Sequence, residues 1–341
     1  MIFSGPIFTA LRTQSLAFFP NEVNVGYARG ISFEDWTSSG AYGIERSDAN
    51  LLVLRSSPIE FSSIFLRDIE YLLNHCFEQF VEIQRLSVDH EVRSDAWGVV
   101  TIYYYAYFAA QLLLRLLGNP VMYLDADIMR LFRQLAAPNR TPGGGSFRIT
   151  LVQTTGPSEA HYELRKLDAR SHNAVWAALF GIIRHHLSIT KQSSSISSEE
   201  EIFYGGLCSN VAHRFYVNDE WPARIRHKAN YVPGFCYSLI EGNVLAKGKK
   251  MLESWKGEKI ENFHNLVDAP VRKFKNCNFD NFEDHVKLLS DVGHGIFSLA
   301  RHLYLDIYGR RNFDKRWENR RIAFLRKHAT LDDYHALFLN D

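Results

Sequence analysis

The longest apolar run of the chain lies between Trp97 and Gly118 and contains a single charged residue, Arg115. Its apolar positions fall on every side of the helix that the run predicts, which is typical of a central helix surrounded by other helices. A helix of this length extends about 33 Å, which would also cross a bilayer. Because the run includes four tyrosines, Thr101 and Gln111, and no other segment compares with it, we expect a buried helix of a soluble protein.

Most other segments have the three- and four-residue apolar spacing of amphipathic helices. Pro58 suits the first turn of one such helix, and Gly118-Asn119-Pro120 is a stop signal after the central one. Residues 241–341 are expected to form a final helical region. The expected helices outside the central run cover residues 56–86, 125–137, 169–189, 286–308 and 317–328.

Alternation of apolar and polar residues predicts a small amount of β structure. Residues 147–152 and 161–167 predict a β-hairpin inserted among the helices. Residues 22–33 and 49–54 predict short strands, so the first fifty-odd residues are expected to form strands and turns. The glycine-rich loop 138–145 is interpreted as the entry to the hairpin rather than as a phosphate cradle, because no G-K-[ST] follows it.

Together these patterns predict a mainly α protein: a helical bundle with a small N-terminal β element and an inserted β-hairpin. We divide the chain into an N-terminal β-rich element (1–58), a bundle (59–240) with the hairpin near 146–168, and a C-terminal helical region (241–341) that ends in a basic helix.

Composition narrows the classes of function. The formal charge of +1 excludes a chain-wide polyelectrolyte binder, so any nucleic-acid binding must depend on local basic segments. The four cysteines are widely spaced, which argues against a zinc ribbon or a disulfide scaffold and for a reducing compartment. The N-terminus lacks the pattern of a signal peptide. We expect a cytoplasmic protein without a membrane contact, and we predict no cofactor and no metal site.

The most suggestive chemistry follows Asn218 in the segment NDEWPARIRHKANYVPGFCY. Pro222 suits a first helical turn, after which basic and polar side chains crowd one short helix. A basic, solvated helix face is the plain alternative. The residues that we single out as catalytic candidates are Arg226, His227, Asn230 and Tyr231.

The run YYYAYFAAQLLLRLLG, followed much later by a helix bearing R-H-K-A-N-Y, resembles the HEPN superfamily of RNA-associated helical bundles. The stretch Ser171–Trp176 adds a weaker likeness, and the resemblance covers roughly residues 60–240. It implies metal-independent RNA cleavage, in which a base deprotonates the ribose 2′-hydroxyl and an arginine stabilises the developing charge. It also implies a site assembled across a homodimer, in a defence or toxin setting.

Carried over to this chain, the resemblance makes Arg226 the arginine and His227 the adjacent polar residue of the site. The chain departs from the family pattern at Tyr231, where a histidine is expected. Tyrosine, with an ordinary pKa of about 10, is a poor base at neutral pH. Either His227 takes over or the site is degenerate. We interpret His172 as a hydrogen-bonded core histidine rather than a functional one.

A second basic segment covers residues 309–328, where cations far outnumber acids and aromatic residues are interspersed. Such a segment can follow a phosphate backbone while its aromatic side chains stack on bases, or it can form the charged face of a terminal helix. The candidates for nucleic-acid binding in it are Arg310, Arg311, Arg316, Arg320, Arg321 and Lys327.

Two functions therefore remain open from the sequence. The first is an RNA-acting, HEPN-like protein, with metal-independent endoribonuclease activity as its expected chemistry. The second is a non-catalytic interaction subunit that uses the same bundle to form a homodimer or to hold a protein partner.

Overall fold

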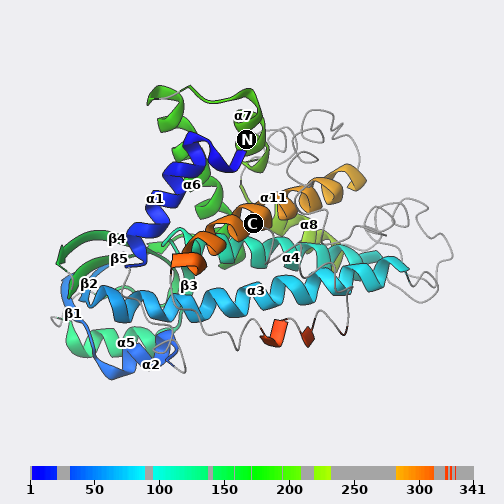
Figure 1. Ribbon diagram of the computed structural model, residues 1–341. Coiled ribbons are helices and arrows are strands. Elements are labelled where there is room, and N and C mark those ends of the chain that lie inside the picture. The colour runs from blue at the N-terminus through cyan, green and yellow to red at the C-terminus, as the bar shows by residue number, and fades with distance from the viewer. Residues whose placement is uncertain are drawn as a thin grey trace.

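The computed structural model describes residues 2–20, 31–88, 95–136, 141–156, 158–169, 171–193, 195–208, 219–231 and 282–310, with 319–321, 323, 324 and 327. Within them the protein is mainly helical, as the sequence predicts, and the strands of the N-terminal element and of the inserted hairpin belong to one antiparallel sheet of five strands. Figure 1 shows the long helices running side by side, with the sheet at one end of them.

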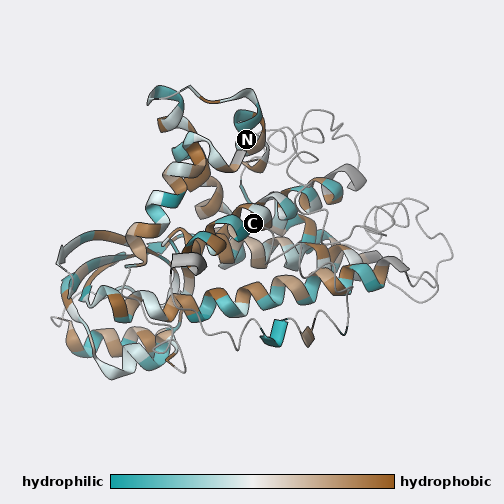
Figure 2. Cartoon of the chain, in the orientation of Figure 1, coloured by the Kyte–Doolittle hydropathy of each residue, from teal (hydrophilic) through white to brown (hydrophobic). Residues whose placement is uncertain are grey.

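Three long helices form the centre of the bundle: α3 (Pro58–Val88), α4 (Asp95–Leu116) and α11 (Phe282–Arg310). α4 packs against both of the others and against shorter helices as well. Figure 2 shows hydrophobic and hydrophilic residues alternating along α3, the pattern of an amphipathic helix, and α3 packs on α4. The other helices are η1 (Ile2–Ser4), α1 (Pro6–Phe18), α2 (Phe33–Ser39), α5 (Ala126–Leu135), α6 (Ser171–Ser193), α7 (Ser198–Leu207) and α8 (Trp221–Tyr231).

The central helix α4 is confirmed where the sequence predicts it. It ends at a left-handed glycine, Gly118, with φ of 66°. The backbone N–H of Gly118 donates to Arg115 and that of Asn119 to Leu114, the paired bonds of a Schellman cap. In the described part of the chain, Ala96–Leu116 is the one helix long and apolar enough to span a membrane. In its most apolar stretch, 83% is buried inside the protein.

The sheet joins the N-terminal strands to the inserted hairpin. Its strands are β1 (Gly43–Ser47), β2 (Leu51–Ser56), β3 (Val121–Leu124), β4 (Gly145–Gly156) and β5 (Glu159–Leu167), in the order β1-β2-β5-β4-β3. Leu54 lies opposite Tyr162, and Leu164 lies opposite both Leu52 and Ile149. These five side chains are fully buried, so one face of the sheet covers the core while the other is polar.

The expectation of only strands and turns in the first fifty-odd residues is wrong. Helices α1 and α2 lie there, and Phe33, which we placed at the end of a strand, begins α2. Ser32 and Asp35 form a capping box at the start of α2. The expected strand at 22–30 lies outside the described residues.

Candidate functional site

Arg226 projects from α8 toward the tyrosines of α4. Its guanidinium carbon lies 5.5 Å from the ring centre of Tyr104 and 5.8 Å from that of Tyr103, within the range of cation–π contacts. The side chain is half-buried, and its Nε–H is buried without a hydrogen-bond partner in the described part of the chain. A buried donor without an acceptor is costly, so an acceptor that reached this N–H would be stabilising.

His172, at the start of α6, lies against tyrosines of the same stretch of α4. Its Nδ1 is 2.7 Å from the Tyr103 hydroxyl, and its ring centre lies 4.4 Å from that of Tyr107. Burial, and then the positive charge of Arg226, lower the pKa of His172 to about 4. The imidazole is therefore neutral at pH 7. We call Arg226, His172, Tyr103, Tyr104 and Tyr107 the Arg226 cluster.

Tyr103 is the fully buried member of this cluster. Burial raises the pKa of its phenol far above the ordinary value, so the hydroxyl keeps its proton at any physiological pH. Trp176, one turn after His172 on α6, directs its Nε1–H toward the Tyr103 oxygen at 3.4 Å. The Tyr103 oxygen accepts this bond, which leaves its own O–H to donate to His172.

Farther along the same side of α4, the polar side chains are hydrogen-bonded to one another. Tyr107 accepts a bond of 2.9 Å from Gln111, which in turn accepts one from Arg115. Arg115 donates to the carboxylate of Asp68 on α3 at 3.0 Å. The charge of Arg115 is thus neutralised within the bundle, in contrast with that of Arg226.

The structure does not place His227 or Tyr231 on the side of α8 that carries Arg226. His227 and Tyr231, one turn apart, are both exposed, and their ring centres lie 5.2 Å apart. Asn230, one turn after Arg226 and on the same side of α8, is exposed as well. Successive residues of a helix point about 100° apart, so His227 does not share the direction of Arg226. The histidine that accompanies Arg226 is His172.

The candidates in the basic terminal segment have different environments. Arg310 is the last residue of α11, and Arg311 and Arg316 lie outside the described residues. Arg320 and Lys327 are exposed. Arg321 is buried and forms an ion pair with Glu70 of α3, so its charge is used within the protein rather than at the surface.

The contacts of Arg321 attach this segment to the bundle. Its Nε donates to Asn74 at 2.7 Å, and the hydroxyl of Tyr304 on α11 donates to Glu70 at 2.8 Å. A cavity of about 180 Å³ lies beside these contacts. Its lining residues are Asn74, Phe77, Glu78, Arg320, Arg321 and Phe324.

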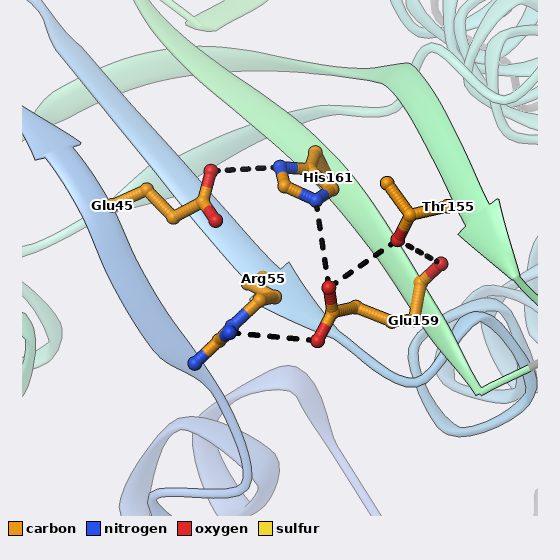
Figure 3. A network of polar contacts seen from close by, with 5 residues as sticks. All are labelled: Glu45, Arg55, Thr155, Glu159 and His161. Carbon is orange, nitrogen blue, oxygen red and sulfur yellow. Dashed lines mark hydrogen bonds and ion pairs between the residues drawn. The ribbon is translucent and has the colours of Figure 1, made fainter.

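Another polar cluster lies on the sheet (Figure 3). His161 on β5 is 2.7 Å from Glu45 on β1 through Nδ1 and 3.8 Å from Glu159 through Nε2. Glu159 also contacts Arg55, at 3.5 Å, and Thr155. These contacts join β1, β2 and β5, which stabilises the sheet, and the carboxylate of Glu159 already has Arg55 as its partner among the described residues.

Sequence reasoning assigned His172 to the core and gave no role to Tyr103 or Trp176. A signal was present: a buried tyrosine or tryptophan needs a hydrogen-bond partner, and the central run holds four tyrosines. The partner itself could not be identified, because His172 lies 69 residues from Tyr103 along the chain.

No group of three or more His, Cys, Asp or Glu side chains that could hold a metal ion occurs among the described residues. Comparison of the chain with protein-family models, with curated proteins and with solved structures gives no match. The chemistry of the Arg226 cluster is therefore the basis for a functional conclusion.

Proposed function

We propose that this chain is an RNA-acting protein of the HEPN-like kind that binds a backbone phosphate of RNA with the Arg226 cluster. One observation carries the proposal: Arg226 is half-buried beside a neutral imidazole and pairs with no carboxylate of the described residues. Other arginines do have an acidic partner: Arg224 lies 3.9 Å from Glu220, and Arg184 is paired with Asp219.

A guanidinium in this setting is suited to an anion. Arginine presents several N–H donors in a plane that matches the oxygens of phosphate, and it is weakly hydrated enough to be partly buried. The rings of Tyr103 and Tyr104 hold the group and exclude water from one side. Partial desolvation strengthens its attraction for a negative charge.

The exposed side of α8 carries a feature that a nucleic acid can use and a small anion cannot. On α8, His227 and Tyr231 form an exposed pair of rings, and Tyr231 is 65% exposed. Exposed aromatic rings stack on unpaired bases, a contact that does not depend on sequence. A phosphate donor and a stacking surface on one short helix are the two parts that single-stranded RNA requires.

The test is the affinity of the full chain for a fluorescently labelled, single-stranded oligoribonucleotide, measured by anisotropy. Arg226→Ala should weaken binding about ten-fold or more, since hydrogen bonds to charged groups contribute about 1.5–3 kcal/mol. Arg224→Ala is the matched control, because it removes an equal charge from the same helix at a residue that faces Glu220. Equal affinities of the wild type and Arg226→Ala would contradict the proposal.

The second candidate is metal-independent cleavage at the same cluster. It is favoured by the neutral state of His172 beside Arg226, because a base for the 2′-hydroxyl must be unprotonated and an arginine can stabilise the phosphorane charge. Incubation of labelled RNA with the protein in chelator tests it. Product ending in a cyclic phosphate, absent with His172→Ala, would support cleavage; intact RNA would leave binding as the function.

A further inference from the structure

His172 has a fixed hydrogen-bonding partner on one side only. Its Nδ1 faces the Tyr103 hydroxyl, whereas Nε2 makes no hydrogen bond to the described residues. Two arrangements of protons satisfy a contact between a hydroxyl and an imidazole nitrogen: the hydroxyl donates to Nδ1, or Nδ1–H donates to the hydroxyl. The surroundings of Tyr103 distinguish between them.

Among the described residues, the Tyr103 hydroxyl has one acceptor at hydrogen-bond distance. Trp176 can only donate, so its Nε1–H occupies the Tyr103 oxygen and the phenol proton must go elsewhere. In a fully buried position an unused O–H is costly, and His172 Nδ1 is the acceptor at hydrogen-bond distance. The chain of donors therefore runs from Trp176 through Tyr103 to His172, and the ring keeps its own proton on Nε2.

We propose that Tyr103 holds His172 as a neutral hydrogen-bond donor at Nε2, so that Arg226 and His172 together bind a singly charged internal phosphodiester in preference to a terminal phosphate. This inference rests on the proposed function of RNA binding. It is incompatible with cleavage by His172, because an imidazole that accepts at Nδ1 and carries its proton on Nε2 has no free lone pair with which to act as a base. Tyr103 is a positioning residue in it, because it touches His172 and not the RNA.

The preference for an internal phosphodiester follows from the number of charges in the cluster. Among the described residues, the groups that face His172 are Tyr103, Tyr104 and Tyr107 from α4 and Arg226 from α8. Arg226 is the one charged group among them. An internal phosphodiester carries one negative charge, whereas a terminal phosphate carries about −1.5 to −2 near pH 7. The second negative charge of a terminal phosphate would enter a half-buried, aromatic site that has no second positive charge to pair with it.

The proton position on His172 is measured by nitrogen NMR of the full chain labelled at histidine, with the His172 signals identified by their loss in His172→Gln. The wild type should show a proton on Nε2 and none on Nδ1 at pH 7. Tyr103→Phe removes one buried hydroxyl and should give a mixture of the two forms. A wild-type ring protonated on Nδ1 would overturn the inference.

Affinity gives the second readout, with two probes that compete against labelled RNA: uridylyl-uridine, which has only an internal phosphodiester, and uridine 5′-monophosphate. The dinucleotide should compete about three- to ten-fold better, the effect of one net hydrogen bond or of an uncompensated charge. Tyr103→Phe should lose a similar factor in RNA affinity, and His172→Gln, which retains an N–H donor, should lose less than His172→Ala.

Tyr105→Phe is the matched control, since Tyr105 is a buried tyrosine of the same helix whose hydroxyl contacts His294 instead, at 3.1 Å. It should leave RNA affinity unchanged. Failure of the wild type to bind RNA would overturn the proposed function itself. If the wild type binds RNA and Arg226→Ala does not, but the monophosphate competes equally well or Tyr103→Phe binds normally, only this inference is wrong.

Discussion

At the scale of single residues, three buried or half-buried arginines have two kinds of surroundings. Arg115 and Arg321 are paired with the carboxylates of Asp68 and Glu70, so their charges hold helices together. Arg226 lies against tyrosine rings and a neutral histidine instead. A paired arginine stabilises the fold, and an arginine held by rings has its hydrogen-bonding capacity left for a ligand.

The neutral state of His172 makes the stability of the protein depend on pH. Histidine has a pKa of 6.5 in the unfolded chain and about 4 at this position. Between these values the unfolded state binds more protons than the folded state, so this contribution to stability is complete above pH 6.5 and is lost as the pH falls toward 4. His186, whose pKa is also lowered by burial, acts in the same direction.

The free energy of unfolding, measured in urea at several pH values, checks this. His172→Gln should flatten the decline between pH 6.5 and 4, because the variant has no proton to gain at this position. A variant with the same pH dependence as the wild type would contradict the assignment.

The ion pair between Arg321 and Glu70 is expected to respond differently to single and double changes. Both side chains are about 95% buried or more, so Arg321→Ala leaves an uncompensated carboxylate and should cost about 3–5 kcal/mol in urea denaturation. The double variant Glu70→Gln with Arg321→Met removes both charges and should lose less. Equal losses in the two variants would show that the pair contributes only packing.

At the scale of elements, local signals predict most of the fold. The apolar run of α4, the helical spacing of α3 and the alternation in β4 and β5 depend on neighbouring residues, and all four elements are confirmed. Helix α1 was missed although Ile7, Leu11 and Phe18 follow a helical period. Its N-cap Gly5 offers no side chain, and the buried carboxylate of Glu200, 193 residues away, accepts from Ile7 instead. A cap supplied by a distant residue cannot be recognised locally.

The contact between α4 and α11 depends on a residue without a side chain. A Cβ on Gly293 of α11 would lie 2.9 Å from the Cβ of Ala106, whereas one on Gly181 of α6 would meet no atom within 4 Å. Gly293→Ala should therefore cost about 1–3 kcal/mol by overpacking, and Gly181→Ala should stabilise the protein by about 0.5–1 kcal/mol through helix propensity.

Thermal or urea unfolding of the two glycine variants gives the comparison, because each makes the same chemical change within a helix. Shifts of opposite sign are the expected result. If both variants were stabilised, the helices would not be as closely packed at Gly293 as the structure shows.

At the scale of the whole molecule, residues far apart in the sequence build both the sheet and the site. β2 pairs with β5 across more than a hundred residues, and the Arg226 cluster combines α4, α6 and α8. The sequence singles out Arg226 through its local pattern, but it cannot show that the nearby histidine is His172 rather than His227. That choice depends on which side of α8 packs on α4, a property of the assembled bundle.

The measurement that tests the central claim most directly is the salt dependence of RNA affinity for the wild type and Arg226→Ala. Each phosphate contact with a single strand contributes about 0.7 to the slope of log affinity against log salt concentration. If Arg226 binds a phosphate, the variant should bind more weakly and its slope should be smaller by about that amount. Weaker binding with an unchanged slope, or unchanged binding, would contradict the account.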